Sequence, residues 1–174
     1  MEDTIEIPKG ITVKMEKDTI SVAGKLGEVK RKLSDPFVDI SINDDKILFS
    51  SELNTRKQKR IIQTFKSEIK SIFKGVIHGV TYKMKVIFVH FPATVKVEGQ
   101  KVRVDNFLGE RSPRYANVFP GVDIKVNKQD IELKGVDPYA VSQSAANIEQ
   151  ACKITKRDRR VFQDGVYITS KDSE

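Results

Sequence analysis

The chain carries the same sequence pattern twice. Residues 12–28 (TVKMEKDTISVAGKLGE) align without gaps with residues 94–110 (TVKVEGQKVRVDNFLGE), at an offset of 82. Residues 38–49 (VDISINDDKILF) align with residues 122–133 (VDIKVNKQDIEL), at an offset of 84. In each copy a helical pattern follows. Two collinear blocks followed by the same kind of element predict a tandem duplication, because ordered matches of this kind rarely arise by chance.

Each copy has the pattern of an α+β fold. The segments ITVKM and TISVA alternate apolar and polar residues as half-buried strands do, and VDISI with KILF forms a second pair. The segment TYKMKVIFVHF reads as a strand that opens the second copy. We expect two tandem duplicated domains, 1–80 and 81–174, each a small antiparallel sheet with one amphipathic helix packed on it. Residues 153–174 are expected to form a basic C-terminal extension of the second domain.

The two helices have different boundary signals. Asn54 or Thr55 can cap the first helix, and Gly75 is expected to stop it. The second helix is expected to open with Asp137 as its N-cap and Pro138 at its first position. Both segments carry an apolar stripe at helical spacing. Each stripe is expected to face the sheet of its own copy.

The composition indicates an acidic partner. The 174 residues carry a formal net charge of +7, which is typical of proteins that bind nucleic acid or an anionic membrane surface. No apolar run is long enough to span a bilayer, and the N-terminus lacks the apolar core of a signal peptide. The single cysteine gives no disulfide framework. We therefore expect a cytoplasmic protein that does not bind membranes.

The reactive side chains do not form a catalytic pattern. His78 and His90 are the only histidines, and neither has metal-binding spacing with Cys152. We expect His78 to be structural or exposed, His90 to be half-buried and hydrogen-bonded, and Cys152 to be a small core residue. A hydrolase using either histidine is the weakest alternative. The chain is thus expected not to be an enzyme and to have no cofactor, metal or small-molecule substrate.

Several basic segments are candidates for binding an anionic partner. Residues 56–60 (RKQKR) open the first helix, where they are either a solvated face or a contact with such a partner. Arg111 and Arg114 lie in a loop-like segment, GERSPRY, that suits phosphate contact. Lys101 and Arg103 alternate outward on a strand.

The strongest basic cluster lies near the C-terminus. Four cations occur within five residues with only Asp158 to offset them, and arginine makes planar, bidentate contacts with phosphate. We expect this segment to lie along a surface, since little core remains to be joined after the second helix. Phe162 and Tyr167 are expected to anchor it to its own domain, although base stacking is an alternative. The Asp164-Gly165 turn signal predicts a hairpin between RRVF and VYIT.

Five stretches together resemble a known family. They are IPKGITV, GVTYKMKVIFVHFP, FLGERSPR, QSAANIEQACKI and KRDRRVFQDGVYI, and they resemble large-subunit ribosomal protein family six in its archaeal and eukaryotic branch. The short extensions at both ends favour an archaeal source. The resemblance covers essentially the whole chain. It implies two duplicated α+β domains and a structural place in the large ribosomal subunit.

The resemblance also implies partners and sites. It implies binding to large-subunit rRNA near the translation-factor binding region, between the sarcin–ricin loop and the stalk base, with ribosomal proteins of the stalk-base region as neighbours. Gln143 and Asn147 belong to the signature of the last helix, with either an RNA or a structural role. The candidate rRNA-binding residues are Lys101, Arg103, Arg111, Arg114, Lys153, Lys156, Arg157, Arg159 and Arg160. A free-standing RNA-binding module acting outside the ribosome is the alternative.

Overall fold

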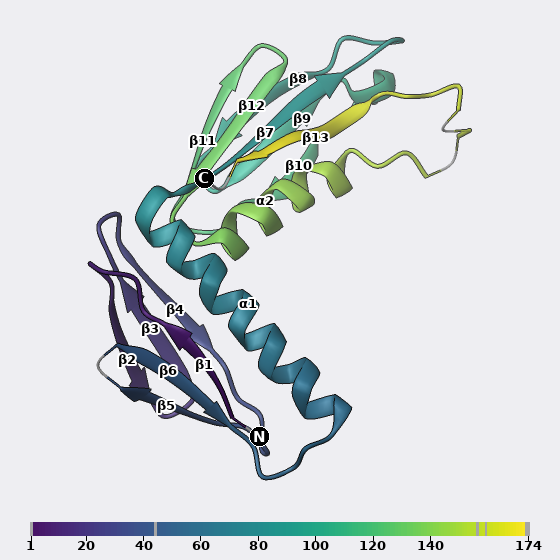
Figure 1. Cartoon of the computed structure of the whole chain (residues 1–174). Coiled ribbons are helices and arrows are strands. Elements are labelled where there is room, and N and C mark those ends of the chain that lie inside the picture. The colour runs from purple at the N-terminus through teal and green to yellow at the C-terminus, as the bar shows by residue number, and fades with distance from the viewer. Residues whose placement is uncertain (1, 44, 156, 159, 173–174) are drawn as a thin grey trace. The chain divides into compact units, whose positions relative to one another are not determined.

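The computed structural model describes residues 2–43, 45–155, 157–158 and 160–172. The chain divides into two compact units, the first ending at His78 and the second beginning at Gly79 (Figure 1). Each unit combines antiparallel strands with one long helix, so the α+β class predicted from the sequence is confirmed.

The first unit contains six strands and one helix. They are β1 (Glu2–Glu6), β2 (Thr12–Glu16), β3 (Thr19–Ala23), β4 (Glu28–Lys32), β5 (Asp39–Asn43), β6 (Lys46–Ser50) and α1 (Arg56–His78). The strands form two sheets, β1-β6-β5 and β2-β3-β4, and not the single sheet that we expected. Pro36 lies between β4 and β5, where its missing N–H cannot continue a ladder of hydrogen bonds.

Helix α1 covers the core of this unit with its apolar face. Ile62 and Ile69 on that face are fully buried, as are Ile20, Ile47 and Phe49 from the strands. At the helix N-terminus the N–H of Gln58 donates to the Thr55 side chain at 3.5 Å, so Thr55 and not Asn54 is the cap. The Thr55 hydroxyl also contacts the side-chain oxygen of Gln58.

The predicted stop of α1 at Gly75 is wrong. Gly75 lies inside the helix and is buried, and the helix continues to His78. Gly79 has a φ of 80°, the left-handed conformation that ends helices and that glycine adopts without strain. The N–H of Leu26 donates to the Val76 carbonyl at 3.3 Å, which satisfies one of the last carbonyls.

The second unit repeats this plan and adds a strand. Its elements are β7 (Val80–Ile87), β8 (Thr94–Glu98), β9 (Lys101–Asp105), a short 3-10 helix (Phe107–Gly109), β10 (Arg114–Asn117), β11 (Val122–Asn127), β12 (Asp130–Gly135), α2 (Pro138–Ala151) and β13 (Gly165–Asp172). The order β7-β12-β11 corresponds to β1-β6-β5, and β8-β9-β10 corresponds to β2-β3-β4. The matching sheet orders are the duplication seen in three dimensions, and β13 at the edge of β7 has no counterpart among the described residues of the first unit.

Helix α2 begins as the sequence predicts. The carboxylate of Asp137 accepts a hydrogen bond from the Tyr139 N–H at 2.9 Å, and Pro138 occupies the first turn. The predicted stripe is buried: Val141, Ala145, Ile148 and Cys152 are all at most 2% exposed. These side chains pack against the strands of the second unit.

Strand β13 corrects two expectations about the C-terminal segment. It pairs antiparallel with β7, from Gly165 opposite Ile87 to Asp172 opposite Thr81, so the predicted hairpin between RRVF and VYIT is not formed. The segment therefore does not lie along the surface throughout, because Val166 is 1% exposed in the core. Among the described residues of this segment, those from 153 to 164 lie outside the sheet.

Candidate nucleic-acid interface

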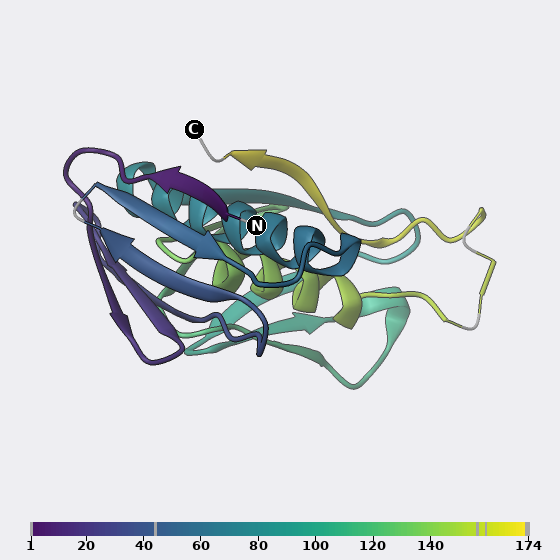
Figure 2. The same cartoon turned by 60° about the horizontal axis from the view of Figure 1, so that its bottom comes forward.

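Residues 153–164 form a basic arm between α2 and β13. In both views the arm extends beyond the ends of these two elements before returning to the sheet (Figures 1 and 2). Its two ends are fixed in the core, since Ile154 is 8% exposed and Asp164 is 2% exposed. Two of the predicted binding residues, Lys156 and Arg159, lie outside the described residues. The arm is thus a loop closed at both ends.

Asp164 holds the C-terminal end of the arm. Its Oδ1 accepts hydrogen bonds from the backbone N–H groups of Val89 at 2.6 Å and His90 at 3.3 Å. Its Oδ2 lies 2.8 Å from Nδ1 of His90, so the predicted hydrogen bond of this histidine is present, but the residue is exposed and not half-buried. Burial acts to raise the pKa of Asp164, but the His90 hydrogen bond and the two backbone N–H groups together hold it below its usual value. Since Asp164 takes the N–H groups of Val89 and His90, β7 ends at Ile87 and not at residue 91.

Aromatic stacking continues from this anchor into the arm. The ring of His90 stacks on Phe162 with centroids 4.6 Å apart, and the guanidinium of Arg157 lies 4.7 Å from the Phe162 centroid. Phe162 is half-buried and Arg157 is exposed. Stacking on an aromatic ring orients a guanidinium and leaves its N–H groups free to donate. This supports the predicted role of Phe162 as an anchor.

A tight turn presents Arg160. The N–H groups of Val161 and Phe162 donate to the Asp158 carbonyl at 3.1 and 2.9 Å, and the N–H of Arg160 donates to the Asp158 carboxylate at 2.9 Å. The Arg160 guanidinium pairs with the same carboxylate at 3.0 Å, which lowers the pKa of Asp158. The Arg160 side chain is nevertheless 90% exposed. An exposed pair of this kind is weak, so an anionic partner can compete for Arg160.

The guanidinium of Arg114 is engaged in contacts within the second unit. It forms a two-pronged contact with Glu110 at 2.6 and 2.8 Å and donates to the carbonyls of Ala151 and Lys153. Its guanidinium also lies 4.4 Å from the centroid of Phe107. The hydrogen bond from Arg114 lowers the pKa of Glu110. Arg114 lies at the start of β10 and not in a loop, and it joins this strand to the beginning of the basic arm.

The other predicted site residues differ in whether their charges pair with carboxylates of the protein. Arg103 donates to Asp105 at 2.7 Å and to Glu98 at 3.4 Å, so its charge is matched within the sheet. Lys101, Arg111 and Lys153 are exposed. The structure therefore brings Arg114 and Lys153 together through a side-chain to backbone contact, and it places Lys101 and Arg103 at the start and middle of β9.

The signature residues of α2 have structural contacts. The Gln143 amide donates to the Asn147 side chain at 3.0 Å, and the Asn147 amide donates to the Asn117 carbonyl at 2.9 Å. This pair links α2 to the end of β10. Both side chains therefore have a structural role.

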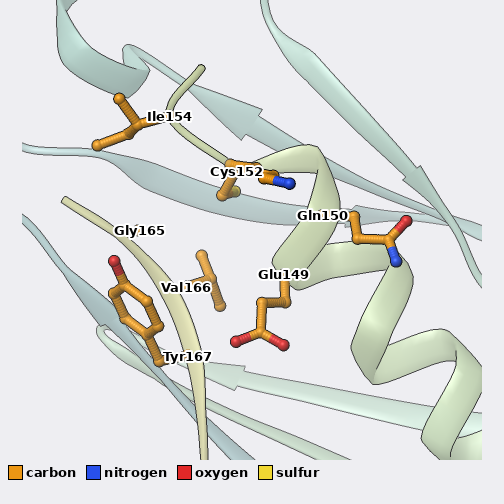
Figure 3. Close-up of a pocket in the computed structure, with 8 residues that line it drawn as sticks. Glu149, Gln150, Cys152, Ile154, Gly165, Val166 and Tyr167 are labelled. Carbon is orange, nitrogen blue, oxygen red and sulfur yellow. The ribbon is translucent and has the colours of Figure 1, made fainter. Parts of the chain in front are cut away.

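A pocket of about 270 Å³ lies at the base of the arm, between the end of α2 and β13 (Figure 3). Its lining residues are Glu149, Gln150, Cys152, Lys153, Ile154, Gly165, Val166 and Tyr167. Burial raises the pKa of the Cys152 thiol to about 11, so the thiolate that a nucleophile requires is scarce near neutral pH. Cys152 is a core residue, as the sequence predicts.

The described residues contain neither a metal-binding cluster nor a membrane-spanning helix. Among the described residues, no group of three or more His, Cys, Asp or Glu side chains is arranged to hold a metal ion. Within the same part of the chain, neither helix combines the length and apolar character needed to cross a bilayer.

Comparison with known proteins identifies relatives over almost the full length. The family model described as Ribosomal protein L6 matches residues 7–79 and 91–165. The chain is 41% identical over 173 residues to the large ribosomal subunit protein uL6 of Ignicoccus hospitalis, covering 97% of this chain and 93% of the relative. It is also 41% identical over 172 residues to the protein of the same name from Methanobrevibacter smithii, covering 99% and 97%. The protein of that name from Methanocella arvoryzae is 41% identical over 168 residues, covering 96% and 95%.

Proposed function

Because this chain belongs to the ribosomal protein L6 family, in its archaeal type, we propose that it binds and stabilises large-subunit rRNA near the translation-factor binding region. Membership of this family makes it a protein of the large ribosomal subunit. The role is structural and not catalytic, and the place of action is the ribosome in the cytoplasm. Ribosomal proteins of the stalk-base region are the expected neighbours.

The observation that carries the proposal is the basic arm. Its described cations, Lys153, Arg157 and Arg160, are exposed, while both ends of the arm are buried. A loop anchored at both ends loses less conformational entropy on binding than a free tail of the same length. Folded RNA is recognised largely through its shape and its phosphates, which a fixed set of cations can match. Lys156 and Arg159 remain predicted contacts in the same arm.

The contribution of each candidate follows from its surroundings. Arg157 offers a guanidinium oriented by Phe162, and Arg160 offers one whose weak pair with Asp158 is easily exchanged. Arg111, Lys153 and Lys101 are exposed and are proposed as further phosphate contacts. The matched charges of Arg103 and Arg114 suit positioning better than direct contact.

Protein–RNA crosslinking on intact large subunits tests the proposal. We expect crosslinks from the arm to one region of large-subunit rRNA, and cosedimentation with large subunits through moderate salt. Crosslinks to many unrelated RNAs would instead support the free-standing RNA-binding module. Recovery of the protein only in the soluble fraction would contradict both the location and the partner.

A matched pair of variants tests the arm itself. Arg157→Ala with Arg160→Ala removes two proposed phosphate contacts, so the slope of log affinity against log salt should become shallower by about two. The control, Lys85→Ala with Lys125→Ala, removes the same charge from exposed strand positions of the second unit. An equal effect of the two variants would mean that net charge, and not the arm, controls binding.

A further inference from the structure

A second basic surface runs along the outer face of α1. Positions 56, 60, 63, 67, 70 and 74 succeed one another at steps of four and three residues, which is the spacing of one row on a helix. All six are exposed, and the row carries Arg56, Arg60, Lys70 and Lys74, with Lys59 beside them. We call these five cations the α1 stripe. At 1.5 Å per residue the stripe extends over about 27 Å.

The cations of the α1 stripe are not matched within the protein. In the described part of the chain, none of the five side chains forms an ion pair or hydrogen bond, whereas Lys66 on the same helix pairs with Asp3 at 2.6 Å. Glu68 is the only acidic residue of α1. The charge of the stripe is therefore available to a partner.

The arrangement works against the stability of the helix. The first turn has no acidic residue, and cations there oppose the helix dipole. Arg56 with Arg60, and Lys70 with Lys74, are like-charge pairs four residues apart, which are destabilising. A face that only needed to be soluble would be more stable with mixed charge. The pattern points to a function for the positive charge.

The chemistry of this face favours an RNA backbone over a protein. The large hydrophobic residues that are exposed in the first unit, Leu26, Phe37 and Leu53, all lie outside α1. Protein interfaces are centred on apolar or aromatic anchors and are depleted in lysine. Without an aromatic side chain on this row, unstacked bases have nothing to stack on. A straight row of cations instead suits the phosphates of a base-paired segment.

A shallow depression lies on the surface of α1, between the cations at the two ends of the stripe. It has a volume of about 550 Å³ and is lined by Lys59, Arg60, Gln63, Thr64, Ser67 and Glu68. The side chains of Gln63 and Ser67 occupy the row where the cations are interrupted. The middle of the face is thus open and without a cation, which allows a bulky backbone to lie along the helix.

We infer that the α1 stripe is a second RNA-binding surface, which contacts the phosphate backbone of a base-paired RNA segment independently of the basic arm. The inference rests on the proposed function for the class of partner, but it concerns the other unit. The protein would then hold two RNA segments, one for each of its duplicated units.

The test compares two full-length variants of equal charge. In the stripe variant, Arg56, Lys59, Arg60, Lys70 and Lys74 are all changed to Gln. In the control variant, the exposed residues Lys9, Lys14, Lys17, Lys25 and Lys32 of the same unit are changed to Gln. The probe is an RNA duplex of about 20 base pairs of mixed sequence, titrated from 50 to 200 mM salt, and poly-L-glutamate is the protein-like comparison.

The stripe variant should bind the duplex at least about tenfold more weakly at 100 mM salt, with a salt slope shallower by about four, while the control changes much less. Its melting temperature should be unchanged or higher, because like-charge repulsion is removed, so a loss of folding cannot imitate the result. Equal effects of the two variants would overturn the inference. So would a stripe variant that loses poly-L-glutamate but keeps the duplex, because the surface would then fit an acidic protein. If the stripe variant binds RNA normally but the variant with Arg157→Ala and Arg160→Ala binds it more weakly, the inference about α1 fails while the proposed function does not.

Discussion

Removal of the Asp164 carboxylate should destabilise the second unit strongly. This side chain is 2% exposed and accepts three hydrogen bonds, from the N–H groups of Val89 and His90 and from His90 Nδ1. A hydrogen bond to a charged group contributes about 1.5–3 kcal/mol, and here three donors lose their acceptor together. We expect Asp164→Ala to lower the free energy of unfolding of this unit by about 3–4 kcal/mol. Asp164→Asn keeps one oxygen acceptor and should cost about half as much.

The tyrosines provide an assay specific to this unit. The chain has no tryptophan, and its four tyrosines, Tyr82, Tyr115, Tyr139 and Tyr167, all lie in the second unit. Urea unfolding followed by tyrosine fluorescence therefore reports the unit that contains Asp164. Far-UV circular dichroism, which sees both units, should show that the first unit is unaffected.

The effect should depend on pH in one direction. Since the pKa of folded Asp164 is lower than its ordinary value of 3.8, its contribution is fully present above 3.8. The contribution is lost as the pH falls through the folded pKa, because protonation of the carboxylate then occurs in both states. The difference in stability between the natural protein and Asp164→Asn should thus be constant near neutral pH and should narrow below about pH 4.

An exposed carboxylate in the same sheet is the control. Asp172 pairs with Lys83 at 3.3 Å, but its side chain is 49% exposed, and such pairs contribute little. Asp172→Asn should leave the free energy of unfolding almost unchanged. If Asp164→Ala costs no more than this control, the buried anchor of the basic arm does not exist as described.

Three further predictions concern the same unit. Arg114→Ala should lower the free energy of unfolding by about 1.5–3 kcal/mol in urea titrations, since it removes a bidentate carboxylate contact and two carbonyl contacts, whereas exposed Arg111→Ala should have almost no effect. Cys152 should react very slowly with a thiol reagent at pH 8 until the protein is unfolded, because a pKa of about 11 leaves only about 0.1% thiolate and the side chain is buried. Gly135→Ala should cost about 1–3 kcal/mol in the same titrations, as its new Cβ would lie 2.7 Å from a methyl group of Val141.

The sequence predicted best what local patterns determine. The cap at Asp137 and the turns within the repeated hairpins depend on residues a few positions apart, and the structure has them as expected. Thr55 is the cap of α1, and Gln58 three residues later completes the Thr-x-x-Gln sequence of a capping box. The stop of α1 was misplaced because both Gly75 and Gly79 fit the local signal. Only the burial of Gly75 distinguishes them.

The features that were missed depend on distant residues. Gly165 pairs with Ile87, far away in the sequence, and no local pattern separates a strand that joins this edge from one that turns back in a hairpin. The anchoring of the basic arm by Asp164 depends on the same long-range pairing. The structural role of Arg114 had a local signal, however, because Glu110 lies four residues before it.

The duplicated units place their cations on different elements, and the difference has a structural cause. Helix α1 carries its positive charge on the outer row, whereas α2 has no lysine or arginine and uses small residues such as Ala145 to pack closely. In the second unit the added strand β13 closes residues 153–164 into an arm, which supplies a new position for cations beyond the end of the sheet. Among the described residues, the first unit has no strand equivalent to β13, and its unmatched row of charge lies on its helix. The same fold thus displays two distinct basic surfaces, one on α1 and one on the arm.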